Sequence, residues 1–298
     1  MKPVWAFKRK AWPAIHLTGE DRIDFLQRLS TQNFKSFSPG TVAPSAFLNG
    51  NGTVVGLFLA WIQNDRITLL PEPQSQAIIV SHIDKLHFGE KIEVQTERVD
   101  FIEVRGQQAR ERLERELGAE PSAGEWPRSV VSGILPGEPW DGAGWLVPGA
   151  HEAKLSAIPF LSEPEYYALR AEHLFPRDQV DVGENNIILE AGLLDYVHRN
   201  KGCYPGQEVI ERIFTYGNVA KRLVLLEGQA RELEKGSELY FNEKKVGNVT
   251  SRHAGQGASH YYVATVFRLH ATPGNVFSLG AGQTPQLKVL KVAGAESA

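Results

Sequence analysis

Cysteine is nearly absent from the chain, since Cys203 is the only one in 298 residues. A single thiol forms no intramolecular disulfide, which is typical of proteins in a reducing compartment. Positive charge is not in excess either: the formal net charge is -3, so no global field attracts nucleic acid or anionic lipid. The longest apolar run, Val54–Ile62, is far shorter than the roughly 20 residues of a membrane-spanning helix. The charged, aromatic segment Met1–Leu17 lacks the apolar stretch of a signal peptide. We expect a soluble, cytoplasmic protein that binds neither membranes nor nucleic acid directly.

Several common catalytic patterns are also missing. The sequence has no G-x-G-x-x-G after a strand, no G-x-x-x-x-G-K-[ST], no H-E-x-x-H and no paired C-x-x-C. These absences exclude the usual dinucleotide, P-loop, zinc-protease and dithiol sites. Of the histidines, only His198 lies close to Cys203 in sequence, and a plain surface position explains it as well as a role beside the thiol.

What is present is a mixture of strand and helix patterns. Residues 12–18 predict a short strand, followed by a helix with Thr18 as its N-cap. Val42–Leu48 and Val54–Ile62 flank the turn sequence Asn49–Gly52 and predict a β-hairpin.

The predicted secondary structure changes close to residue 220, from mixed strands and helices to short strands. Residues 1–220 contain two similar passes of strands and helices, which predict an α+β body of two subdomains that divide near residues 100–150. Residues 221–298 contain short strands separated by glycine and asparagine, which predict a small C-terminal β-barrel from about Lys221 to Val292.

The segment KGCYPGQEVIERI, residues 201–213, surrounds the only cysteine. A lone cysteine is commonly a small buried hydrophobe, but Gly202 and Gly206 predict a loop, and loops seldom bury a residue deeply. A short helix is expected to follow. A thiol near Lys201 and ahead of a helix N-terminus is disposed to ionise, and a thiolate binds soft metals or attacks electrophiles. The residues alone leave both interpretations of Cys203 open.

This segment resembles the signature of the YgfZ family, which joins a Lys-Gly-Cys-aromatic sequence to Gly-Gln-Glu and a short helix. The stretches His16–Phe34 and Lys245–Ser251 resemble the same family, so the resemblance extends from about Trp12 to Arg268. The wider superfamily includes the folate-binding aminomethyltransferase, or T-protein, of glycine cleavage. The resemblance implies an aminomethyltransferase-like α+β fold, with two interlocked subdomains, a C-terminal β-barrel and a central cavity for tetrahydrofolate. The signature residues in this chain are Lys201, Gly202, Cys203, Tyr204, Gly206, Gln207, Glu208 and Arg212.

The resemblance also implies residues of a folate site. Trp12 matches a ligand-contacting tryptophan of the family, and Tyr166 matches a second tryptophan, replaced here by another aromatic residue. Glu172 falls in a Glu-Ala-Gly segment whose carboxylate binds the pterin, although His173 and Leu174 replace Ala-Gly in this chain. A pterin stacks on aromatic rings and donates paired hydrogen bonds to a carboxylate. Core or rim positions for the two aromatics, and a solvated helix end for Glu172, are the alternatives.

Basic residues complete this expectation. Arg170, with Lys221 or Arg222, offers positive charge for the glutamate tail of folate. A transient iron–sulfur cluster at Cys203 is also expected, and because one thiolate cannot provide the four ligands of a [2Fe–2S] centre, a partner chain, a second copy or small thiols would share it.

An acidic residue is missing where the transferases of the superfamily use one. Val55, Gly56 and Leu57 follow the hairpin turn, and general acid–base catalysis needs a titratable group there. We therefore expect a monomeric, folate-binding accessory factor rather than a turnover enzyme. It would support iron–sulfur cluster assembly or repair, including in tRNA-thiolating enzymes, with client or assembly proteins as partners. A tetrahydrofolate-dependent aminomethyltransferase or demethylase, and a protein-interaction module that no longer binds folate, remain alternatives.

Overall fold

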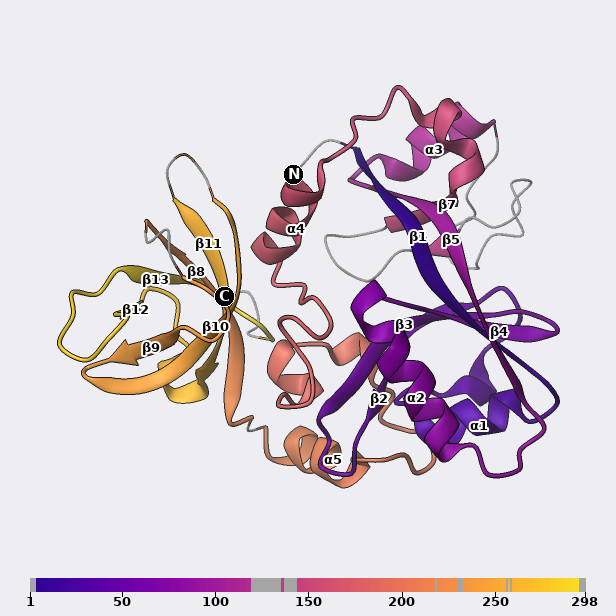
Figure 1. Ribbon diagram of the computed structural model, residues 1–298, viewed down its shortest axis with the longest axis horizontal. Helices are drawn as coiled ribbons and strands as arrows, with labels where there is room; N and C mark the ends of the chain where they lie inside the picture. The colour runs from indigo at the N-terminus through magenta and orange to yellow at the C-terminus, as the bar shows by residue number, and fades with distance from the viewer. Residues whose placement is uncertain are drawn as a thin grey trace. The chain divides into compact units, whose positions relative to one another are not determined.

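The computed structural model describes residues 4–118, 135–136, 144–217, 219–229, 233–255, 257 and 259–294 (Figure 1). Its contacts divide the chain into two compact units. Unit 1 contains Met1–Leu48, Val55–Ser162 and Asp195–Pro205, and unit 2 contains Asn49–Val54, Glu163–Leu194 and Gly206–Ala298. The predicted domain boundary near residue 220 and the subdomain division near residues 100–150 stay predictions, and part of the latter range lies outside the described residues.

Unit 1 is built on one sheet with the strand order β2-β3-β4-β1-β5-β7-β6. The long central strand β1 pairs antiparallel with β4 on one side and with β5 on the other. Its strands are β1 (Trp5–Thr18), β2 (Val42–Leu48), β3 (Val54–Ile62), β4 (Arg66–Pro71), β5 (Glu93–Arg105), β6 (Leu135–Pro136) and β7 (Gly144–Pro148). The hairpin predicted from the turn Asn49–Gly52 is confirmed, with Gly52 at the positive φ of +75° that such a turn requires.

Helices cover the apolar side chains of this sheet. One cluster joins Phe25, Leu26 and Leu29 of α1 to Ile79 and Ile83 of α2, together with buried residues of the central strands. A second cluster packs α3 against β5 and β7. The α-helices of unit 1 are α1 (Arg22–Leu29), α2 (Gln76–Leu86) and α3 (Ala109–Leu117), and the 3-10 helices are η1 (Phe34–Ser36), η2 (Pro73–Ser75) and η3 (Gly149–Leu155).

The predicted N-cap of the first helix is wrong. Thr18 is the last residue of β1, where it pairs with Arg66 and Glu93. Asp21 is the N-cap instead, and its Oδ2 accepts a hydrogen bond from the backbone N–H of Lys91 at 2.7 Å. Because the strand continues to Thr18, the chain needs the turn at Gly19 before the helix can begin.

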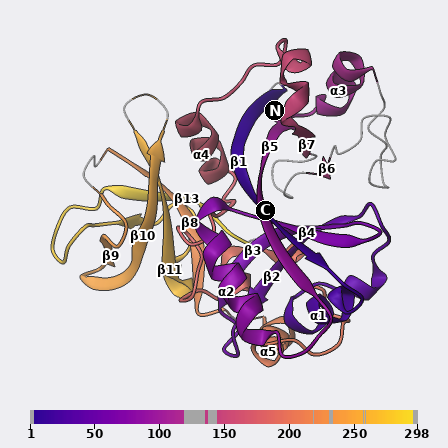
Figure 2. The same ribbon diagram turned by 45° about the vertical axis from the view of Figure 1, so that its right-hand side comes forward.

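Unit 2 contains a curled sheet with the order β12-β13-β8-β11-β10-β9 (Figures 1 and 2). A bridge between Tyr240 and Ser278 links its two ends, so the sheet is nearly closed. The barrel predicted from Lys221 to Val292 is confirmed, because β8 begins and β13 ends at these residues. The strands are β8 (Lys221–Gly228), β9 (Glu238–Phe241), β10 (Lys244–Ala254), β11 (His260–Phe267), β12 (Val276–Phe277) and β13 (Leu287–Val292).

Helix α4 (Glu163–Glu172) contacts β10 and β11 of this sheet. Helix α5 (Gln207–Tyr216) follows the cysteine segment, as predicted from the sequence, and Ile210 is its buried residue. The remaining 3-10 helices are η4 (Ile188–Ala191), η5 (Leu194–Tyr196) and η6 (Arg268–His270). No helix in the described part of the chain has the length and apolarity to cross a membrane.

Candidate functional site

The cysteine lies on a loop of unit 1 formed by residues 197–205. Cys203 is exposed, as the glycines around it predict, and Gly202 is exposed beside it. Tyr204 is buried, and the ammonium of Lys201 lies 5.0 Å from the centre of its ring. The loop therefore holds two of its side chains in the protein interior and presents the thiol outside.

Lys201 anchors this loop to the end of α1. Its Nζ donates hydrogen bonds to the backbone carbonyl oxygens of Gln27 and Ser30, which are at the C-terminal end of the helix where carbonyls lack intrahelical partners. Burial lowers the pKa of Lys201 to about 8. The backbone N–H of His198 adds a bond to the carbonyl oxygen of Thr31 at 2.9 Å. The predicted influence of Lys201 on the thiol stays a prediction, and the structure gives the ammonium a direct role in holding the loop.

The rest of the signature belongs to unit 2. Gly206 has a φ of +80°, and a Cβ there would come within 2.6 Å of the carbonyl oxygen of Asn49 and of the Cα of Gly52. Only glycine fits this position, because it combines a left-handed backbone with close packing against the hairpin turn. In α5, Glu208 and Arg212 are exposed and Gln207 is half-buried.

Trp12 follows an irregularity in β1. The pairing of β1 with β5 shifts between Arg9 and Trp12, Ala11 has a φ of +47°, and its N–H donates to Oδ1 of Asp100 at 2.7 Å. Such bulges redirect side chains and are frequent beside functional sites. The Trp12 indole is 5% exposed, the Arg9 guanidinium lies 4.5 Å from its ring, and its buried N–H has no acceptor among the described residues.

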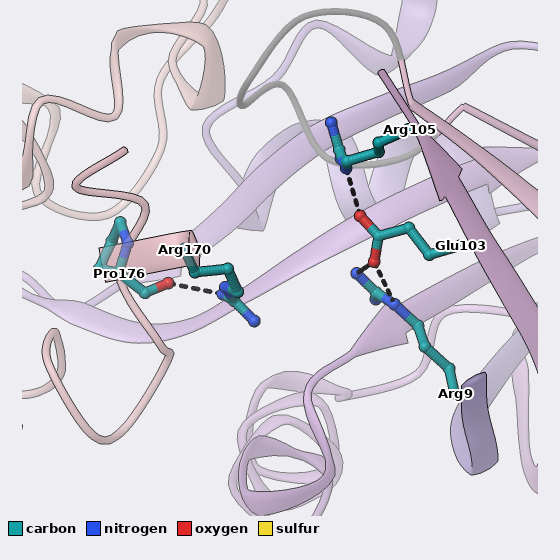
Figure 3. Close-up of polar contacts among 5 residues, drawn as sticks. All are labelled: Arg9, Glu103, Arg105, Arg170 and Pro176. Atoms are coloured by element: carbon teal, nitrogen blue, oxygen red, sulfur yellow. Dashed lines mark hydrogen bonds and ion pairs between the residues drawn. The ribbon is translucent and has the colours of Figure 1, made fainter. Parts of the chain in front are cut away.

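Arg9 also belongs to a buried ion cluster that the sequence patterns did not reveal (Figure 3). Glu103 accepts hydrogen bonds from Arg9 on one oxygen and from Arg105 on the other, and these three side chains are at most 2% exposed. Burial alone would raise the pKa of Glu103, but the two guanidinium charges and their hydrogen bonds outweigh it and lower the pKa to about 2. The Glu103 carboxylate is therefore ionised at neutral pH.

Helix α4 brings together three of the expected folate residues in unit 2. Tyr166 is fully buried, and Arg170 is 1% exposed. The Arg170 guanidinium donates to the carbonyl oxygen of Pro176 at 2.8 Å (Figure 3) and lies 5.7 Å from the centre of the Tyr166 ring. Glu172 is half-buried at the end of the helix, where its backbone carbonyl accepts a hydrogen bond from Lys291 at 2.6 Å.

The residues that replace Ala-Gly after Glu172 keep a glycine-like backbone. Leu174 has a φ of +51°. The N–H of Leu174 bonds to the carbonyl of Ala171, and the N–H of Phe175 bonds to the carbonyl of Arg170, both at 2.9 Å. This is the hydrogen-bond pattern of a Schellman motif, in which glycine is the preferred left-handed residue. The substitution therefore changes the side chain at this turn and leaves its backbone path intact.

A second polar cluster in unit 2 was not predicted. Asp181 accepts hydrogen bonds at 2.6 Å from the hydroxyls of Thr250 and Ser251, and Ser251 Oγ lies 2.9 Å from Nε2 of His253. Burial lowers the pKa of His253 to about 4, although the charge of Asp181 opposes this shift. Because the serine stands between the acid and the histidine, its hydroxyl is already committed to Asp181, and the cluster lacks the order of a nucleophilic triad. The stretch Lys245–Ser251 was the only hint of this cluster in the sequence.

The structure places no acidic side chain at the positions that follow the hairpin turn. Val55 is half-buried, and Gly56 and Leu57 are buried within β3. Among the residues that the structure describes, no group of three or more His, Cys, Asp or Glu side chains is arranged to hold a metal ion.

Comparison with known proteins supplies relatives. No protein-family model matches the sequence. A chloroplastic protein of Arabidopsis thaliana named as a transferase is 27% identical over 288 residues, which cover 89% of this chain and 66% of that protein, slightly less than two thirds of its length. The tRNA-modifying protein YgfZ of Colwellia psychrerythraea is 23% identical over 267 residues, covering 83% of this chain and 78% of the relative.

A solved structure has the same fold. The glycine cleavage system aminomethyltransferase T of Bartonella henselae matches 97% of this chain and 85% of its own, with a TM-score of 0.76 and 17% identity. The predicted α+β, aminomethyltransferase-like fold is thereby confirmed. Together with the two sequence relatives, this match makes the chain similar to YgfZ in sequence and to the glycine cleavage aminomethyltransferase T in fold.

Proposed function

We propose that the protein binds tetrahydrofolate and supports the assembly or repair of iron–sulfur clusters, including those of enzymes that thiolate tRNA. Cys203 carries this proposal: the only thiol of the chain is exposed, on a loop whose neighbouring side chains Lys201 and Tyr204 are buried. A relative named as a tRNA-modifying protein supports the same direction. A cytoplasmic location belongs to this proposal.

The residues in each unit fit the parts of a folate. In unit 1 the buried indole N–H of Trp12 lacks an acceptor among the described residues, and a pterin ring offers both a face to stack on and acceptor nitrogens. In unit 2 the carboxylate of Glu172 would accept the paired N–H groups of the pterin edge. Tyr166 would support that helix, and Arg170 would add positive charge for the glutamate tail. Tetrahydrofolate, when bound, supplies nitrogens that carry one-carbon units.

An iron–sulfur cluster would be cargo rather than a resident group. One exposed thiolate supplies one of the four protein ligands that a [2Fe–2S] cluster needs. The described residues place no further cysteine and no metal-binding group of His, Asp or Glu beside it. Cys203 would therefore hold a cluster only together with ligands from a client protein, an assembly protein, a second copy or small thiols, and release would need only ligand exchange.

Turnover as a tetrahydrofolate-dependent aminomethyltransferase or demethylase has weaker support. Proton transfer to the folate nitrogen needs a titratable group in reach, and the residues that follow the hairpin turn are Val55, Gly56 and Leu57. An interaction module without folate is disfavoured by the backbone after Glu172, which keeps the left-handed turn despite Leu174.

Folate binding is tested by titrating tetrahydrofolate while recording tryptophan emission. We expect Trp12→Ala to weaken binding by about 1–3 kcal/mol, the range for loss of an aromatic stacking platform. Trp12→Phe keeps most of the ring and should weaken binding less. The matched control, Trp61→Ala, removes a tryptophan that has no role in the proposed site and should leave the affinity unchanged. Equal affinities of the Trp12 variants and the wild-type protein, with the fold intact by circular dichroism, would refute the assignment.

The thiol is tested separately in cells that lack the endogenous protein. Cys203→Ser should abolish rescue of the activity of iron–sulfur enzymes, because a hydroxyl is a poor ligand for soft metals. The purified variant should bind tetrahydrofolate like the wild-type protein. Full rescue by the serine variant would show that the thiol is dispensable.

A further inference from the structure

A small pocket lies at one end of the barrel sheet in unit 2, where β8 and β10 begin and β11 ends. Its volume is about 190 Å³. Register pairs bring its parts together, since Lys221 stands opposite Phe267 and Asn248 stands opposite Thr265. The lining residues are Lys221, Lys245, Val246, Gly247, Asn248, Thr265 and Phe267.

The polar side chains of this pocket have hydrogen-bond donors that are free to bind a ligand. Lys221 is half-buried, and its ammonium forms no ion pair with any carboxylate in the described ranges. Thr265 has a buried hydroxyl oxygen without a hydrogen-bond partner among the same residues. Lys245 donates to Glu238 at 2.6 Å, which leaves two of its three N–H donors available.

Two carboxyl groups lie near the ammonium groups of this pocket, and each already accepts hydrogen bonds. Glu238 is shared between Lys245 and the hydroxyl of Tyr240. Glu190 accepts a hydrogen bond from the backbone N–H of Lys221 at 3.0 Å, and its carboxyl is buried. Two ammonium groups therefore line the pocket, with the hydrogen-bonded carboxylate of Glu238 and the buried carboxyl of Glu190 nearby.

Strand β10 has an irregular backbone where it lines the pocket. Its pairing with β9 shifts between Lys245 and Gly247, and such irregularities are common beside binding sites. A Cβ on Gly247 would come within 2.2 Å of the carbonyl oxygen of Thr265. Glycine thus lets two strands approach closely at the floor of the pocket.

An aromatic ring completes the rim. Phe267 lines the pocket and is 47% exposed, and the exposed Arg268 follows it in the chain. The exposed Phe267 ring therefore lies beside a group of hydrogen-bond donors. A ligand with both an anionic group and an apolar group would contact both features.

We propose that this pocket is an anion site that binds the phosphate of a phosphate monoester whose apolar or aromatic group lies on Phe267. Two ammonium groups and one hydroxyl match the several oxygens of a dianionic phosphate better than the two of a carboxylate, and lysine binds phosphate as a compact point charge. The site uses none of the cysteine-loop residues and none of Trp12, Tyr166, Arg170 and Glu172; of the residues considered for folate it uses only Lys221, an alternative for the glutamate tail.

Phenyl phosphate is the test ligand, titrated into the full-length protein by calorimetry and by two-dimensional amide NMR. We expect saturable binding, with shifts centred on the amides of Gly247 and Thr265. Inorganic phosphate should bind at the same amides but at least about tenfold more weakly, and benzoate should not saturate. Shifts spread over all exposed lysines, or equal binding of benzoate, would overturn the proposal.

Variants locate the binding groups. Lys221→Gln and Thr265→Val should each weaken phenyl phosphate by about tenfold or more, whereas Lys288→Gln, an exposed lysine on β13, should have no effect. Phe267→Ala should lower the affinity for phenyl phosphate to the level of inorganic phosphate. The same variant should leave the affinity for inorganic phosphate unchanged. Wild-type affinity in Lys221→Gln would refute the site even if Thr265→Val failed to fold.

A competition experiment with tetrahydrofolate tests whether this pocket is separate from the proposed folate site. A saturating amount should not displace phenyl phosphate, and Trp12→Ala should bind phenyl phosphate normally. Competition between the two ligands would show that the pocket belongs to the folate site and would overturn the claim of a separate one.

Discussion

Replacing Glu103 by glutamine tests the buried ion cluster of unit 1. Glu103→Gln keeps the shape of the side chain but removes the charge that lies between Arg9 and Arg105. Both arginines are at most 2% exposed, so the variant removes the carboxylate charge that two buried guanidinium groups share. Breaking a buried ion pair in this way costs about 3–5 kcal/mol of unfolding free energy, and we expect a loss of that size at pH 7.

The pH dependence gives a second magnitude. Folding lowers the pKa of Glu103 from its usual 4.5 to about 2, so the ionised carboxylate stabilises the folded state fully above about pH 4.5. This contribution is lost as the pH falls toward 2. Each unit of pKa corresponds to about 1.4 kcal/mol, which makes the loss about 3 kcal/mol in the wild-type protein. The variant lacks this titration, so the difference between the two proteins should shrink by about 3 kcal/mol between pH 5 and pH 2.

Urea unfolding followed by tryptophan emission measures this difference in unit 1, because the tryptophans that the structure describes all lie in segments assigned to it: Trp5, Trp12, Trp61 and Trp145. The matched control is Glu93→Gln, an exposed glutamate on the same strand β5, which should change the unfolding free energy by less than about 0.5 kcal/mol. Parallel stability curves for the wild-type protein and Glu103→Gln from pH 7 to pH 2 would refute the ionised cluster.

Three further results are expected. Gly206→Ala should lower the unfolding free energy by more than about 1 kcal/mol in urea titrations, because a left-handed backbone alone costs a non-glycine residue about 1–2 kcal/mol. The control Gly202→Ala should be nearly neutral, because a Cβ at that position meets open space. Equal effects of the two substitutions would contradict the packing of Gly206. Lys201→Met should cost about 1–3 kcal/mol through the carbonyls that it leaves without donors, and an unchanged midpoint would argue against that anchor. Iodoacetamide should alkylate Cys203 in the folded protein; labelling only after denaturation would make it a core residue.

Local patterns were sufficient for most elements. Apolar segments with turn residues between them predicted the hairpin of β2 and β3, and short strands separated by glycine and asparagine predicted the barrel from about Lys221 to Val292. These predictions held because strand pairing across a short turn depends on neighbouring residues. The N-cap at Thr18 was wrong because β1 gains two partners from distant segments, β4 and β5, and this pairing extends the strand beyond its local preference.

The sequence by itself determined the kind of fold, the loop around Cys203 and the requirement for glycine at a turn such as Gly52, because each depends on residues close together in the chain. The cluster of Arg9, Glu103 and Arg105, the contact of Lys201 with the end of α1, and the pocket beside Lys221 were decided only by the tertiary structure. They join side chains from segments far apart in the chain. The spacing of a charged residue in the sequence is the same whether its side chain is exposed to water or buried. Only the packing of strands and helices determines which charged side chains are buried and which opposite charge lies beside each of them.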